Sequence, residues 1–115
     1  MTLNDRLKGL IGLAKRGKYV VYGEKLPFNM KKKKVSLLFL ASDAAKNSCS
    51  DLMSIVEKLE DTHPIAVIRL LSKEDLGDSI GSAPVAGLGI LNSGIAKRIM
   101  ELEEEINNGQ KEQEL

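Results

Sequence analysis

The residue types that most often carry out chemistry are sparse in this sequence. The single histidine, His63, precedes Pro64 in a predicted turn and has no second histidine to share a metal, so we expect a solvated residue without a zinc site or a Ser/His triad. The single cysteine, Cys49, falls on an apolar helical stripe with Leu52 and Val56, which predicts a packing role. The sequence therefore indicates a protein that is not an enzyme.

Two further patterns are poor candidates for a catalytic or cofactor site. Gly87-Leu88-Gly89 lacks the third glycine and the following acidic residue of a dinucleotide fingerprint. The carboxylates that precede the C-terminal segment are dispersed among Lys and Arg at helical spacing, which is typical of exposed faces. We expect no cofactor, no metal ion and no small-molecule substrate.

Lysine and arginine carry the clearest chemical signal. Residues 1–34 hold ten Lys or Arg against two acidic residues, a net charge of +8, whereas residues 101–115 hold six Glu against one Lys, a net charge of −5. The densest run, Lys31–Lys34, lies at the C-terminal end of a predicted helix, where the macrodipole favours cations with or without a ligand. Together with Arg16, Lys18 and Lys25, this run could converge on one edge and bind the phosphates of a polyanion.

The segment Gly77 to Val85 (GDSIGSAPV) is rich in small residues, so it is either a plain turn or a loop whose backbone approaches a flat partner closely. Aromatic residues make up only 3% of the chain, too few for the stacking surfaces of an RRM or OB-fold. Shape readout of a structured RNA fits this composition better.

These residues must be positioned by one small domain. The chain has 115 residues, of which 43% are hydrophobic and 29% charged, as in an ordinary soluble protein. No stretch reaches the roughly 18 apolar residues of a membrane span, and the N-terminus is charged where a signal peptide would be apolar. We expect a cytoplasmic protein.

Hydrophobic periodicity predicts alternating helices and strands. Apolar residues spaced by three and four predict helices over residues 3–14, 24–33, 44–59, from 72 and from 92, and apolar runs predict strands over 19–22, 35–41, 65–71 and 85–91. Thr2 with Asp5, Ser42 with Asp43, Ser72 with Asp75, and Asn92 or Ser93 are the predicted caps. This alternation predicts a three-layer α/β/α sandwich around a mixed four-stranded sheet. The domain is predicted to span residues 1–106, and residues 107–115, which follow the helix stop at Asn107-Asn108-Gly109, are predicted to be a disordered acidic tail.

Four segments in order resemble the L7Ae/L30e family of ribosomal proteins, in particular its bacterial cytoplasmic members. They are Gly12–Lys25 (GLAKRGKYVVYGEK), Leu37–Ser48 (LLFLASDAAKNS), Ser72–Gly81 (SKEDLGDSIG) and Asn92–Ile99 (NSGIAKRI). The resemblance implies a non-catalytic protein that binds a kink-turn, which is a sharply bent RNA element.

The resemblance also implies which residues would contact RNA. The loop and helix start that enter the RNA groove correspond to Gly23, Glu24 and Lys25, with Lys18 before them and Asn29 or Lys31 one turn on. Lys32, in the basic run, is also predicted to bind RNA. The small-residue loop that packs on flipped-out nucleotides corresponds to Ser82, Ala83, Pro84 and Val85. Strong kink-turn binders of this family carry Asn-Glu where this chain has Glu24-Lys25.

Three functions remain open from the sequence. The first is an adaptor, ribosomal or ribosome-associated and monomeric, that recognises a kink-turn-like structured RNA. The second is a protein-protein module in which the last helix and the acidic tail bind a basic partner. The third is the substrate-recognition domain of an RNA methyltransferase, although no catalytic domain follows in this sequence.

Overall fold

The computed structural model describes the backbone of residues 2–114 and the side chains of residues 2–105. The elements follow one another in the predicted order, and the strands are shorter than predicted. Their bounds are α1 (Leu3–Arg16), β1 (Val20–Tyr22), α2 (Lys25–Lys31), β2 (Leu37–Leu40), α3 (Lys46–Leu59), β3 (Ala66–Ile68), α4 (Lys73–Ile80), β4 (Gly87–Ile90) and α5 (Ser93–Glu114). No helix within the described residues is long and apolar enough to cross a lipid bilayer.

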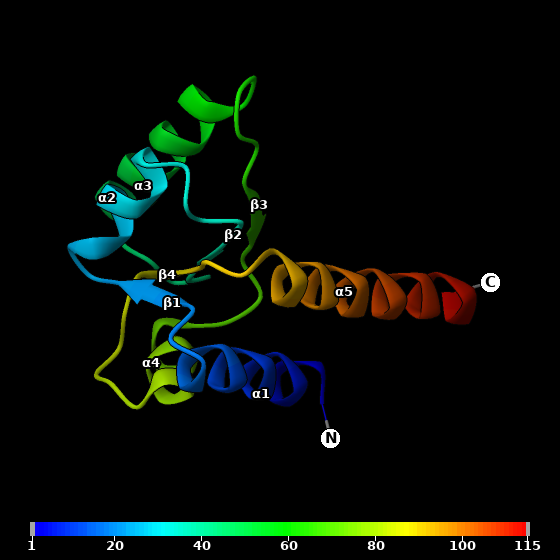
Figure 1. Cartoon of the computed structure of the whole chain (residues 1–115). Coiled ribbons are helices and arrows are strands. Elements are labelled where there is room, and N and C mark those ends of the chain that lie inside the picture. The colour runs from blue at the N-terminus through cyan, green and yellow to red at the C-terminus, as the bar shows by residue number, and fades with distance from the viewer. Residues whose placement is uncertain (1, 115) are drawn as a thin grey trace.

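The four strands form one mixed sheet in the order β1-β4-β2-β3. Strand β4 is antiparallel to both of its neighbours, β1 and β2, and β3 is parallel to β2. Helices α1, α4 and α5 cover one face of the sheet, and α2 and α3 cover the other (Figure 1). This confirms the predicted three-layer α/β/α sandwich.

The central strand β2 is buried on both faces because successive side chains point in opposite directions. Leu37 and Phe39 join the core beneath α1, α4 and α5, whereas Leu38 and Leu40 join the core beneath α2 and α3. All four side chains are at most 1% exposed. The continuous apolar run in the sequence predicted this two-sided burial correctly.

Three of the predicted helix caps are present. Thr2 and Asp5 form a capping box, in which the Asp5 N–H donates to Thr2 Oγ1 (3.1 Å) and the Thr2 N–H donates to Asp5 Oδ2 (3.3 Å). Hydrogen bonding to Thr2, through its side chain and then its backbone, holds the pKa of the Asp5 carboxyl below its ordinary value. Ser72 accepts from the Asp75 N–H (3.1 Å) and caps α4, and Asn92 accepts from the Ile95 N–H (2.9 Å).

The predicted cap of α3 is wrong. Its N-cap residue is Ala45, which makes no side-chain hydrogen bond. Asp43 instead accepts from the Lys73 N–H (2.8 Å), thirty residues further along the chain. A carboxylate satisfies whichever unpaired N–H the fold brings to it, and here that donor belongs to the first turn of α4.

His63 is also placed differently from the prediction. Its side chain is half-buried, and Nε2 lies 3.0 Å from the Val35 carbonyl oxygen, so it ties the turn before β3 to the residues that lead into β2. Proximity of the parallel strands β2 and β3 creates this contact, which spans 28 residues of sequence.

Helix α5 begins as predicted but ends later. Its backbone stays helical through Asn107-Asn108-Gly109 to Glu114, because the Glu, Gln and Lys residues that follow are strong helix formers. Residue 115 and the side chains from residue 106 onward lie outside the described residues, so the predicted division between domain and tail stays a prediction.

Candidate nucleic-acid interface

Two segments that the sequence singled out meet at one end of the sheet, where β1 and β2 end and β4 begins. We call this the pocket end, because Gly23, Pro84 and Val85 line one cavity of about 400 Å³ there. The remaining walls come from the start of α2, the first half of α3 and the first residues of β4. They are Leu26, Pro27, Ser48, Asp51, Leu52, Ala86 and Gly87.

Gly23 makes the turn from β1 into α2. Its φ of +65° lies in the left-handed region, which a glycine adopts without steric cost, and its carbonyl accepts from the Leu26 N–H (3.1 Å). Glu24 then takes the N-cap position without a side-chain hydrogen bond, and both Glu24 and Lys25 are exposed. The predicted polar pair is therefore free to contact a ligand at the rim of the cavity.

The second segment is a short, braced loop. Residues 77–80, which the sequence assigned to it, belong to α4, and the loop begins at Gly81, which ends that helix with a φ of +69°. The Ser82 N–H donates to the Gly77 carbonyl (2.9 Å), the Val85 N–H donates to the Lys73 carbonyl (3.2 Å), and Ser82 Oγ donates to the Ala83 carbonyl (2.8 Å). These bonds hold a loop of small side chains against α4.

Glycines on β4 determine how closely α2 approaches the sheet. A Cβ atom on Gly89 would lie 2.9 Å from Leu26 Cδ1 and 3.0 Å from both methyl groups of Val35, and one on Gly87 would lie 3.2 Å from Leu52 Cδ1. The pattern Gly87-Leu88-Gly89 therefore serves packing, since it lets α2 rest directly on the strand backbone. This approach brings the start of α2 beside the 81–86 loop.

Three predicted residues lie further along α2. The Asn29 side chain is half-buried and donates through Nδ2 to the Lys25 carbonyl (2.8 Å), so the helix already uses part of its hydrogen-bonding capacity. Lys31 lines a shallow groove between α2 and α3. Lys32 is exposed, and its Nζ lies 5.5 Å from the centroid of the Phe28 ring.

The predicted basic residues do not converge on a single edge. Lys18 precedes β1 and Lys33 and Lys34 precede β2, so they lie at the opposite end of the sheet, which we call the lysine end. Lys25 lies at the pocket end, beyond Gly23, and the five residue steps from Lys18 to Gly23 span up to about 16 Å when extended. Strand β1 causes this separation because it carries the chain from the lysine end to the pocket end, and α2 then returns the chain toward the lysine end.

The lysine end has an unusual backbone. Among the described residues, Lys18 (φ +65°) and Lys33 (φ +61°) are the non-glycine residues with positive φ. Lys33 occupies the position after α2 where glycine is usual, with its own N–H donating to the Met30 carbonyl and the Lys34 N–H donating to the Asn29 carbonyl (3.0 Å each). A long cationic side chain stands at both sites despite the steric cost of this conformation.

Sequence reasoning missed two polar residues of the cavity, Ser48 and Asp51. They lie three residues apart on α3 and therefore on the same side of that helix. That spacing was visible, but the wall that the two residues share with Gly23 arises only when α3 packs beside α2. The Asp51 carboxylate disfavours a phosphate at this wall and can accept a hydrogen bond from a base amino group.

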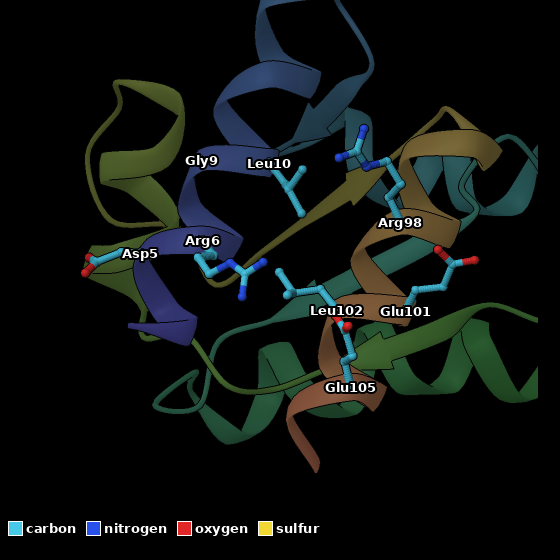
Figure 2. A pocket seen from close by; sticks show the side chains of 8 residues that line it. All are labelled: Asp5, Arg6, Gly9, Leu10, Arg98, Glu101, Leu102 and Glu105. Carbon is cyan, nitrogen blue, oxygen red and sulfur yellow. The ribbon is translucent and has the colours of Figure 1, made fainter. Parts of the chain in front are cut away.

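A second cavity, of about 490 Å³, lies between α1 and α5 on the other face of the sheet (Figure 2). Arg6, Leu10 and Leu102 point into the space between the two helices, whereas Asp5 points away from it. Arg98, Glu101 and Glu105 complete a wall of mixed charge on α5. The last helix was predicted as a possible protein-binding surface, but none of these residues was named individually. Within the described residues, no group of three His, Cys, Asp or Glu side chains could hold a metal ion.

Comparison with known proteins supports the fold. A protein of unknown function from Bacillus halodurans superposes with a TM-score of 0.71 at 24% identity, covering 84% of this chain and 94% of that one. A 15.5kD RNA binding protein from Giardia lamblia superposes with a TM-score of 0.66 at 18% identity, covering 92% and 88%. No match was found among the curated proteins. The family described as Ribosomal protein L7Ae/L30e/S12e/Gadd45 matches residues 5–100, and the chain belongs to it.

Proposed function

We propose that this protein is a non-catalytic RNA-binding adaptor, ribosomal or ribosome-associated, that recognises a structured, kink-turn-like RNA. The observation that carries the proposal is the convergence of Gly23, Pro84 and Val85 on one cavity, with Glu24 and Lys25 exposed at its rim. Family membership and the RNA-binding protein from Giardia lamblia support an RNA partner. Membership also favours a cytoplasmic location, and we expect a monomer.

The charges around α2 are available to phosphates. The salt bridges among residues 2–105 are those of Lys8 with Asp75 (3.7 Å) and Asp78 (3.8 Å), so Lys25 and Lys31–Lys34 have no carboxylate within 4.0 Å in that part of the chain. When such unpaired lysines bind phosphates, they release the counterions that are condensed on the RNA. We therefore expect affinity that falls steeply as salt rises.

The two ends of the sheet suit one continuous RNA. Helix α2 has seven residues and is about 10 Å long, and it connects the pocket end to the lysine end. A bent RNA that places its unpaired bases at the 81–86 loop can run its backbone along α2 toward Lys31 and Lys33. The lysines then supply affinity, while Glu24, Lys25 and the close approach of Ser82 to Val85 supply selectivity.

The test is binding of the purified protein to a kink-turn RNA and to a straight duplex of matched length, at two salt concentrations. The Lys25→Ala variant should weaken kink-turn binding more than duplex binding. An Arg6→Ala variant, which removes one positive charge from the α1–α5 cavity on the other face, should leave the preference unchanged. Equal affinity of the wild-type protein for both RNAs would reduce the proposal to a nonspecific basic surface.

The acidic C-terminal segment favours a second candidate function, a module that binds a basic protein through the last helix and the tail. Residues 101–115 hold six Glu against one Lys, whereas the α1–α5 cavity balances Glu101 and Glu105 with Arg6 and Arg98. Deleting residues 107–115 separates the two functions. RNA binding retained by the truncated chain would show that the acidic segment is not the main interaction site.

A further inference from the structure

Phe28 is exposed on the outer face of α2, although its residue type favours burial. With 59% of its surface accessible, it is the most exposed large hydrophobic side chain among the described residues. Leu26 and Met30 anchor the helix to the sheet with exposures of 3% and 0%. Phe28 lies two residues, or about 200°, from each of them and therefore faces away from the core.

The chain places cations around this ring. Lys32 follows Phe28 by one helical turn, and its Nζ lies 5.5 Å from the ring centroid. Lys25 and Lys31 lie on the same short helix, and none of these lysines has a carboxylate within 4.0 Å among residues 2–105. The chain contains only four Phe and Tyr residues in all, so an exposed ring among lysines is a distinctive use of one of them.

We propose that the outer face of α2 binds one unpaired nucleotide, whose base stacks on Phe28 while Lys32 contacts its phosphate. This inference rests on the proposed RNA-binding function and adds a contact outside the pocket end. An aromatic ring stacks on any base, and an adjacent ammonium group neutralises the phosphate of the same nucleotide. The ammonium group lies on a flexible four-carbon stem, so it can move from the ring to the phosphate as the base arrives.

A nucleotide fits this surface better than a protein does. A stable protein interface buries about 800 Å² on each partner, with charged residues depleted at its centre. One phenyl ring surrounded by Lys25, Lys31 and Lys32 offers neither the apolar area nor the low charge. The same surroundings attract a polyanion.

The first test measures whether the effect of removing each unpaired base depends on the Phe28 ring. Each unpaired nucleotide of a kink-turn RNA is replaced in turn by an abasic nucleotide, which keeps the phosphate, and binding is measured for the wild-type protein and for Phe28→Leu. At one position the abasic change should weaken wild-type binding about five- to 150-fold, the range for loss of one stacked base. The same change should have little effect on Phe28→Leu, whose thermal unfolding should match that of the wild type.

A second test is spectroscopic. The chain has no tryptophan, so Phe28→Trp introduces a single tryptophan at the proposed contact, and its selectively excited emission should change when the RNA binds. Met100→Trp is the matched control, because Met100 is 38% exposed on α5, on the other face of the sheet, and its emission should not change.

The outcomes separate the two proposals. Suppose the wild-type protein binds the intact RNA but no abasic substitution weakens its binding more than that of Phe28→Leu. Then, or if the Phe28→Trp emission is unchanged, the stacking contact is refuted and the proposed function stands. If the wild-type protein binds no RNA, the proposed function is refuted and the stacking contact with it.

Discussion

Replacing Gly77 by alanine should push the 81–86 loop away from α4. Gly77 is buried within that helix, and an added Cβ would lie 2.5 Å from the Ala83 carbonyl oxygen and 2.9 Å from the Ser82 carbonyl oxygen. Ordinary contacts of a Cβ atom begin at 3.4 Å, so the loop backbone must move by about 1 Å. The displaced residues are those predicted to pack on RNA.

Two opposing effects determine the size of the change. Overpacking costs about 1–3 kcal/mol, and alanine in a helix interior is more favourable than glycine by about 1 kcal/mol. Gly77→Ala should therefore lower the free energy of unfolding by up to about 2 kcal/mol. Gly9 is a matched control, because it lies in α1, is exposed, and has no atom within 4 Å of the added Cβ. Gly9→Ala should raise the free energy of unfolding by about 1 kcal/mol.

Urea unfolding of both variants measures the difference, which should be about 1–3 kcal/mol. Kink-turn RNA binding at a temperature where both variants are folded should be weakened by Gly77→Ala and unchanged by Gly9→Ala. If Gly77→Ala stabilises the protein as much as Gly9→Ala does, the loop does not pack against α4 as described. If Gly77→Ala is destabilised but binds RNA normally, the loop is not part of the interface.

Three other predictions concern the backbone, the capping box and the sheet. Lys33→Gly should raise the free energy of unfolding in urea by about 1 kcal/mol, because glycine adopts this positive-φ conformation without the steric cost that lysine has. If Lys33 contacts a phosphate, the same change should also reduce the slope of log K for RNA binding against log salt concentration by about 0.9. Asp5→Asn should lower the thermal midpoint near neutral pH. Because the pKa of Asp5 is lowered in the folded state, this stabilisation is present above the ordinary Asp pKa and is lost as pH falls through the lowered value, so the two proteins should converge in strong acid. Gly89→Ala should lower the free energy of unfolding by about 1–3 kcal/mol, measured calorimetrically, since its Cβ would meet Leu26 and Val35; an unchanged value would contradict the close packing of α2 on β4.

Much of the candidate site could be predicted from local sequence. Gly23 ends a short strand and precedes a helix, and residues 77–85 are rich in small side chains, so both segments stood out by composition alone, although residues 77–80 proved to be helical. Asp51 could not be assigned to the site, because its role depends on which helix packs beside α3. The predicted convergence of Lys18 and Lys25 was wrong for a related reason, since strand direction and not distance along the chain decides which end of a sheet a residue occupies.

The sequence by itself determined the number, type and order of the elements, two-sided burial of β2 and the caps at Thr2, Ser72 and Asn92, because periodicity and capping are short-range properties. Only the tertiary structure decided the strand order β1-β4-β2-β3. It also decided that Asp43 binds the N–H of Lys73 and that Gly77 accommodates the 81–86 loop. These contacts join residues distant in sequence, and packing selects them only after the elements have formed.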